Sequence, residues 1–194
     1  MEMYASKWMY LHEYVIAQMK KNISPLVIVK NVHTEKFKAD EDIIARNIFL
    51  TITYHRAMWQ WLFDNPKETK KDFIKEFHIT GLVVNSCFLC SYVDKHSTYI
   101  YDEDGFKTFF FNCALCPVKW PSSLTENQCL YSNEEYERDG LFSQFCRVRY
   151  NELVYSCDNF DFNSYLKSLS LAKRIRDLPL TDEVAAIFKS EGLK

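Results

Sequence analysis

Three features of the sequence predict an α+β fold that is mainly helical and carries a small hairpin lobe. Apolar residues recur at three- and four-residue steps near both ends of the chain, which is typical of amphipathic helices. Runs of β-branched and aromatic residues on both sides of Asp102-Glu-Asp-Gly105 indicate a β-hairpin. The 194 residues are enough for one sizeable core, so a single compact domain over residues 1–194 is expected.

The N-terminal region predicts one helix and one strand. Apolar residues at positions 4, 8, 11, 15 and 19 draw a single stripe along a helix from Met3 to Lys21. The short run Leu26–Val29 is rich in β-branched residues and follows Pro25, which favours a strand. This part of the chain could then contribute to a small sheet.

The next segment predicts the central helix and a shorter one after it. Residues 40–63 combine helical apolar spacing with three acidic residues at the start, where a helix N-terminus favours negative charge. This should be the longest helix. Asn65 and Pro66 are expected to end it and to begin a shorter helix that runs to Phe77. Residues 82–84 are interpreted as a strand that leads into a cysteine-rich segment.

The C-terminal third predicts further helical segments. Residues 132–135 have the pattern of a capping box, which indicates a helix start at Ser132. Residues 141–155 fit helix or strand, and helix is preferred. Residues 163–177 carry helical spacing, and Thr181 is expected to cap a last helix.

Two Cys-x-x-Cys pairs form the most informative motif of the chain. The first contains Cys87 and Cys90, and the second, after the expected hairpin, contains Cys113 and Cys116. Each pair can direct two thiolates to an ion about 2.3 Å away, and a hairpin returns the second pair to the first. We therefore expect one structural Zn²⁺ ion bound by these four cysteines in a zinc-ribbon-like hairpin lobe at residues 82–131. Four thiolates close the tetrahedral shell and leave no open position for a substrate.

Other interpretations of the seven cysteines stay open. Buried free thiols or an iron–sulfur cluster could use the same four residues, although the compact spacing of bacterial ferredoxins is missing. Cys129 could replace one ligand, but is expected to lie next to the metal shell or in the core. Cys146 and Cys157 are expected to be ordinary buried thiols. The odd cysteine count and an N-terminus without a signal-peptide pattern favour a reducing, intracellular compartment, and no stretch is apolar enough for a membrane span.

No catalytic residue is predicted from the sequence. His96 lies between the two cysteine pairs, where nucleases of the His-Asn-His type place a catalytic histidine near a structural zinc ion. The local sequence Asp94-Lys95-His96-Ser97 lacks their Asp-His pair, so we expect His96 to be an exposed residue at the start of the hairpin. Glycine-rich phosphate loops and the zinc-deaminase signature are also missing from the sequence.

The order of the cysteines resembles a pattern in bacteriophage proteins. Its residues are Cys87-Phe-Leu-Cys90, Cys113-Ala-Leu-Cys116-Pro117-Val118 and Cys129, followed by an acidic helix start, within residues 86–136. Small uncharacterised bacteriophage proteins have a similar Cys-x-Leu-Cys, Cys-x-x-Cys-Pro, Cys pattern. The resemblance implies a viral accessory protein that acts in the cytoplasm of a bacterial host.

Two classes of function compete at this point. A net charge of −2 with scattered lysines and arginines lacks the basic patch that nucleic-acid binding requires, whereas an aromatic content of 16% suits a protein interface. We expect a non-enzymatic, zinc-stabilised accessory protein that binds and inhibits or diverts a host protein of unknown identity. The alternative is a nuclease-like, zinc-containing nucleic-acid-processing protein. Candidate anchors are the rings of Tyr99, Tyr101, Phe109 and Phe111, which could equally cover the core of the lobe.

Overall fold

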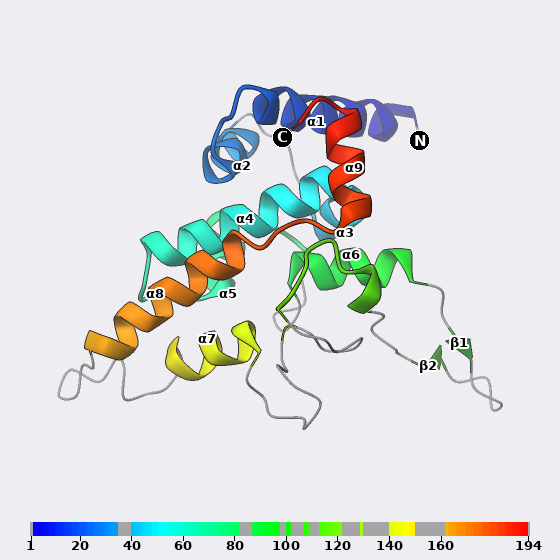
Figure 1. Cartoon of the computed structure of the whole chain (residues 1–194). Helices are drawn as coiled ribbons and strands as arrows, with labels where there is room; N and C mark the ends of the chain where they lie inside the picture. The colour runs from blue at the N-terminus through cyan, green and yellow to red at the C-terminus, as the bar shows by residue number, and fades with distance from the viewer. Residues whose placement is uncertain are drawn as a thin grey trace.

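A computed structural model gives the architecture of the chain (Figure 1). It describes residues 2–34, 40–81, 87–97, 100–101, 107–108, 113–121, 129, 140–149 and 162–193. Within these ranges, side chains are described except at residues 2–9, 100–101, 107–108, 147 and 149. The elements are α1 (Glu2–Lys20), α2 (Pro25–Thr34), α3 (Glu41–Ala45), α4 (Ile48–Asp64), α5 (Lys70–Glu76), α6 (Phe88–His96), β1 (Ile100–Tyr101), β2 (Lys107–Thr108), the 3-10 helix η1 (Cys113–Leu115), α7 (Leu141–Arg149), α8 (Phe162–Arg176) and α9 (Asp182–Ser190).

The described chain is mainly helical, with 73% of its residues in helices, but it has no sheet layer, so the predicted α+β fold with a hairpin lobe is wrong. Strands β1 and β2 are joined by only two residue pairs, Ile100 with Thr108 and Tyr101 with Lys107. Strands of two residues are shorter than those that build a sheet layer. The described core is therefore made by helices packed on helices.

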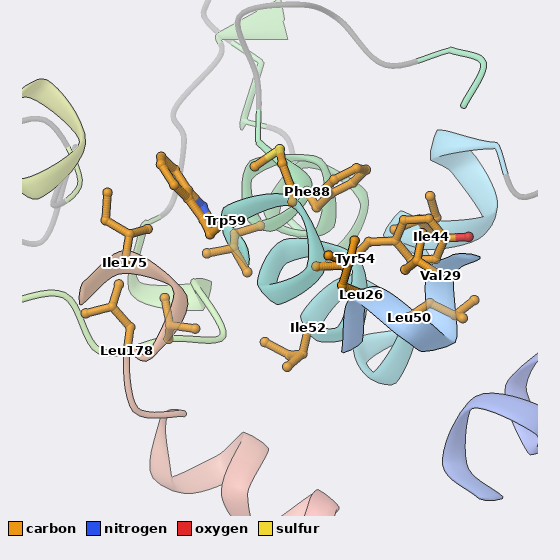
Figure 2. Packing of buried hydrophobic residues seen from close by; sticks show 14 of the residues in the cluster. Leu26, Val29, Ile44, Leu50, Ile52, Tyr54, Trp59, Phe88, Ile175 and Leu178 are labelled. Atoms are coloured by element: carbon orange, nitrogen blue, oxygen red, sulfur yellow. The ribbon is translucent and has the colours of Figure 1, made fainter. Parts of the chain in front are cut away.

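The strand predicted at residues 26–29 is also wrong, because this run lies inside α2. Leu26 and Val29 are three positions apart, as expected of one helix face, and both are buried. Figure 2 shows these two side chains beside residues of α4 in the core. A four-residue apolar run fits a buried strand and a buried helix equally well, and packing against α4 decides the outcome here.

Helix α4 is the centre of the described fold. It packs against α1, α2, α3, α5, α6 and α8, and in Figure 1 it crosses the middle of the molecule with α8 beside it. Every residue from 49 to 55 is buried. Successive residues of a helix point about 100° apart, so this run buries all sides of the helix. This part of the helix predicted over residues 40–63 is therefore covered on every side.

The long helix predicted over residues 40–63 is divided into α3 and α4. Asn47 interrupts it in an extended conformation, and its side chain accepts hydrogen bonds from the backbone N–H groups of Phe49 and Leu50. An asparagine in this geometry caps a new helix. The shorter helix also begins later than predicted, at Lys70, because Thr69 and Asp72 form a capping box.

The remaining helix predictions agree with the structure where it describes them. Residues 3–21 correspond to α1, the first part of 141–155 is helical in α7, and residues 163–177 correspond to α8. Thr181 is the N-cap of α9, although its side chain makes no capping hydrogen bond. The predicted strand at 82–84 and the helix start at Ser132 lie outside the described residues. None of the described helices has both the length and the apolar character needed to cross a bilayer.

His55, which is buried in α4, predicts a measurable dependence of the free energy of unfolding on pH. Its Nε2–H donates to the carbonyl oxygen of Ile175 at 3.3 Å, and its Nδ1 atom has no hydrogen-bond partner in the described structure. Burial lowers the pKa of His55 from 6.5 to about 3. Between these values the unfolded chain binds a proton that the folded chain does not, so the free energy of unfolding falls as the pH is lowered through this window. One such site contributes at most about 1.4 kcal/mol per pH unit.

Urea unfolding at pH 7, 6 and 5 would measure this contribution. We expect His55→Gln to remove it, so that the free energy of unfolding of the variant falls less steeply on acidification than that of the wild type. Replacing the exposed His96 by Gln is the matched control and should keep the wild-type slope. Identical slopes for His55→Gln and wild type would contradict the prediction.

Candidate metal centre

The first cysteine pair lies at the start of α6. Cys87 is the N-cap residue, with φ −105° and ψ 164°, and Cys90 lies in the first turn of the helix. Three positions along a helix bring two side chains to the same face. The two Sγ atoms are accordingly 3.4 Å apart. Thiolates about 2.3 Å from a tetrahedral zinc ion stand about 3.8 Å from one another, so this spacing is close to one edge of such a shell.

The second pair is formed by the tight turn of η1. The backbone N–H of Cys116 donates to the carbonyl oxygen of Cys113 at 3.0 Å, which closes the turn between the two cysteines. Cys116 is buried, and Cys113 is half-buried. The turn packs against α6, so the second pair lies beside the helix that carries the first pair.

The segment that follows Cys116 is fixed by the C-terminal part of the chain. Val118 forms an antiparallel bridge with Leu180, in the connection between α8 and α9. The backbone N–H of Lys119 donates to Pro179 at 2.8 Å, and the N–H of Thr181 donates to Pro117 at 3.0 Å. Cys116 is therefore held in place by residues far along the sequence.

Hydrogen bonds to sulfur support both pairs. The thiol groups of Cys87 and Cys90 are hydrogen-bonded to each other, with 3.4 Å between their Sγ atoms. The indole Nε1–H of Trp120 donates to the Sγ atom of Cys116 at 3.3 Å. A hydrogen-bond donor that points at a sulfur atom stabilises its thiolate form. Hydrogen bonds of this kind, made to a metal ligand by residues that do not bind the metal, also orient the ligand. Cys116 thus has an N–H donor directed at its sulfur atom, which suits a thiolate ligand.

Burial and the charges of neighbouring thiols raise the pKa values of Cys116 and Cys129. Burial raises the pKa of Cys116 to about 12, and negative charge on Cys87 and on Cys113 raises it further. Burial also raises the pKa of Cys129, and charge on Cys87, Cys113 and Cys116 adds to this effect. The backbone of Cys129 is anchored at the start of α7, where its carbonyl oxygen accepts from Phe142 N–H at 3.1 Å.

Within the first pair, the two pKa values move in opposite directions. The thiol–thiol hydrogen bond lowers the pKa of Cys87 to about 6, against the effect of burial. The same hydrogen bond, together with burial, raises the pKa of Cys90. Cys87 is the thiol of this pair that holds negative charge most readily, because the hydrogen bond with the Cys90 thiol stabilises its thiolate.

The four predicted ligands are neighbours without forming a closed shell. Among the described residues, no three side chains of His, Cys, Asp or Glu stand close enough together to enclose a metal ion. A bound ion would have to draw the second pair and the first pair together. Cys87, Cys90, Cys113, Cys116, Cys129 and Cys146 are all free thiols, with no disulfide among them.

Several other predicted residues lie apart from this cluster or outside the description. His96 is exposed in the last turn of α6, where its Nδ1–H donates to the carbonyl oxygen of Tyr92 at 2.8 Å. Cys146 lies in α7, and burial raises its pKa. Cys157 lies outside the described residues, as do the side chains of Tyr99, Tyr101, Phe109 and Phe111.

Two residues near the cluster were missed by the sequence analysis. Trp120 follows Cys116 by four positions, and its indole donor is aimed at that sulfur atom. Lys70 is buried at the start of α5, although the sequence around it contains several other lysines and does not mark it as different. A tryptophan close behind a Cys-Pro pair was a local signal, whereas the burial of Lys70 depends on tertiary packing.

No protein-family model, curated protein or solved structure matches this chain.

Proposed function

We propose that this chain is a non-enzymatic, metal-stabilised binding protein in which Cys87, Cys90, Cys113 and Cys116 hold one structural Zn²⁺ ion. The observation that carries the proposal is that α6 and η1, which carry the two Cys-x-x-Cys pairs, pack against each other. The sulfur spacing of 3.4 Å in the first pair and the indole N–H donor at Cys116 support a thiolate site. Soft thiolate ligands in this number favour zinc or an iron–sulfur cluster over hard cations.

A structural role fits this ligand set better than a catalytic one. Four thiolates complete the tetrahedral shell of zinc and leave no position for a reacting water molecule. Cys129 adds a fifth thiol nearby. If one of the four cysteines did not bind the ion, the sulfur atom of Cys129 would fill its coordination position. The ion would join α6, η1 and the segment bridged to Leu180.

Binding of a partner protein is the activity that we propose for the rest of the molecule. Phe162 and Leu166 lie one turn apart on α8 and are 59% and 47% exposed, and the ring of Phe162 stacks on Tyr165 at 6.2 Å. Large rings are enriched in protein interfaces, and a net charge of −2 does not favour nucleic acid. The cysteine pattern supports a phage accessory protein that binds a host protein in the host cytoplasm.

Metal content is the first test of the proposal. Protein purified without chelators should contain about one zinc ion per chain, and Cys90→Ser or Cys116→Ser should lower that content strongly, because each removes one of the four ligands. Cys146→Ser is the matched control and should keep the zinc. Iron with acid-labile sulfide would show a cluster instead, and unchanged zinc in both ligand variants would contradict the proposed site.

Partner capture tests the binding role separately. Immobilised protein should retain one stoichiometric protein from nuclease-treated bacterial lysate, and Phe162→Ala combined with Leu166→Ala should weaken that retention if α8 contributes the surface. A nucleic-acid affinity that falls steeply with salt, or metal-dependent cleavage lost in His96→Ala, would instead support the nuclease-like alternative.

A further inference from the structure

The first cysteine pair brings two thiols into direct contact at the start of α6. The Sγ atoms of Cys87 and Cys90 are hydrogen-bonded at 3.4 Å, and both residues are free thiols that are half-buried. A disulfide bond is about 2.05 Å long, so the two sulfur atoms would have to approach by roughly 1.4 Å to form one. Rotation of the two side chains supplies an approach of this size without displacing the helix.

The backbone around the first pair holds the two thiols in this position. Cys87 is extended and lies just before the first turn of α6, whereas Cys90 lies within that turn. The carbonyl oxygen of Cys87 accepts hydrogen bonds from the backbone N–H of Ser91 at 3.0 Å and from its hydroxyl group at 3.3 Å. Phe88 and Leu89, between the two cysteines, are 0% and 1% exposed. Fixed positions of this kind raise the effective concentration of one thiol toward the other.

The second cysteine pair is less open to an oxidant than the first. Cys116 is buried, and its sulfur atom accepts a hydrogen bond from the indole Nε1–H of Trp120 at 3.3 Å. The backbone that follows it is held by the bridge between Val118 and Leu180. Oxidants react more readily with exposed thiols than with buried ones. The first pair, with two half-buried thiols in contact, is therefore where a disulfide would form first.

We propose that Cys87 and Cys90 form a redox-active dithiol that closes to an intramolecular disulfide on reaction with a disulfide oxidant such as oxidised glutathione. Cys87 is the attacking thiolate, because the N-terminus of a helix favours negative charge. Its sulfur atom bonds to one sulfur atom of the oxidant, the S–S bond of the oxidant breaks, and one glutathione thiol leaves. Cys90 then attacks the sulfur atom of Cys87 and releases the second glutathione thiol. The two protein thiols lose two electrons and two protons, and the oxidant gains both.

Closure of this disulfide would also act on the proposed zinc site. It converts two of the four proposed ligands from thiolates into disulfide sulfur atoms, and the thiolate is the form of cysteine that binds metal. A zinc-loaded protein would then release its ion as the disulfide forms, and reduction would restore the site. This consequence rests on the proposed metal site, whereas exchange between the dithiol and a disulfide requires no metal.

The test maps the products of oxidation in the full chain. Protein treated with chelator is equilibrated without oxygen in buffers of reduced and oxidised glutathione, quenched with acid, alkylated and analysed by peptide mass spectrometry. In the wild type, the main product should be the disulfide between Cys87 and Cys90, with Cys146 still reduced. Cys90→Ser should lose this disulfide and stop at a mixed disulfide between Cys87 and glutathione. Cys87→Ser should lose it too and form less mixed disulfide, while Cys146→Ser, the matched control, should react as the wild type does.

Two results in the wild type, which depend on no variant, would overturn the inference while leaving the metal site intact. One is a disulfide between Cys87 and Cys90 that is no more abundant than one between Cys113 and Cys116. The other is a glutathione adduct on Cys87 that persists without closure by Cys90. Zinc-loaded protein should release about one Zn²⁺ ion per disulfide, measured with a chromophoric indicator. Formation of the disulfide in a protein that binds no zinc would overturn the proposed metal site and support the dithiol.

Discussion

Removing the proposed zinc ion from the purified protein should lower the free energy of unfolding by about 4 kcal/mol or more, because a ligand present at a thousandfold excess over its Kd stabilises the folded state by this amount. For a chain of this size, such a loss corresponds to a decrease in Tm of roughly 8–16 °C. Thermal unfolding followed by circular dichroism, before and after chelation, measures the change.

Restoring the metal provides the control for this prediction. One equivalent of Zn²⁺ should recover the original Tm of the wild type, whereas Mg²⁺ should not, because thiolates prefer softer ions. Cys116→Ser should unfold near the temperature of the chelated wild type and respond little to added zinc. Equal melting temperatures with and without chelator would contradict the prediction.

Replacing Trp59 by Ala should destabilise the fold by about 3–5 kcal/mol, the usual cost of deleting a buried large aromatic side chain. Trp59 is 1% exposed, and its ring meets Phe145 edge-on at 4.8 Å and Phe142 at 6.2 Å. The substitution would leave a cavity where α4 faces α7. It would also remove one of the two rings beside Lys70.

Urea unfolding compares Trp59→Ala with two controls. Trp59→Phe should cost less than Trp59→Ala, because it keeps a ring and removes a buried indole N–H that has no partner in the described structure. Phe162→Ala removes an exposed ring and should change stability by no more than about 0.5 kcal/mol. A cost for Trp59→Ala that is as small as this would contradict the described packing.

The sequence predicted the helices that carry a regular apolar stripe and failed where tertiary packing decides. The spacing in 163–177 led directly to α8. The run Leu26–Val29 has no period long enough to separate helix from strand, and its burial against α4 made it helical. The division of the predicted helix 40–63 at Asn47 could have been predicted from the local sequence, because an asparagine before an apolar run is a common helix start.

The residues of the candidate site were chosen from the sequence, and its surroundings were not predicted. Cysteine spacing alone selected Cys87, Cys90, Cys113 and Cys116, since that pattern depends only on positions along the chain. The start of a helix at Cys87 was missed, because a Cys-x-x-Cys pair fits a turn as well as a helix N-terminus. The contact of Lys70 with the ring of Phe142 depends on how α5 and α7 come together, and no local pattern encodes it.

The bridge between Val118 and Leu180 has a consequence for the order of folding. A side-chain contact next to it, from Lys119 to Asp182, joins residues 63 positions apart. Contacts this distant in sequence close a large loop, and they generally form later than helices, whose contacts are local. During folding, the second cysteine turn should therefore acquire its final position only after α8 has docked on α4 and carried the α8–α9 connection to it. A chain still in synthesis, with α9 not yet made, would keep its second cysteine pair without this support.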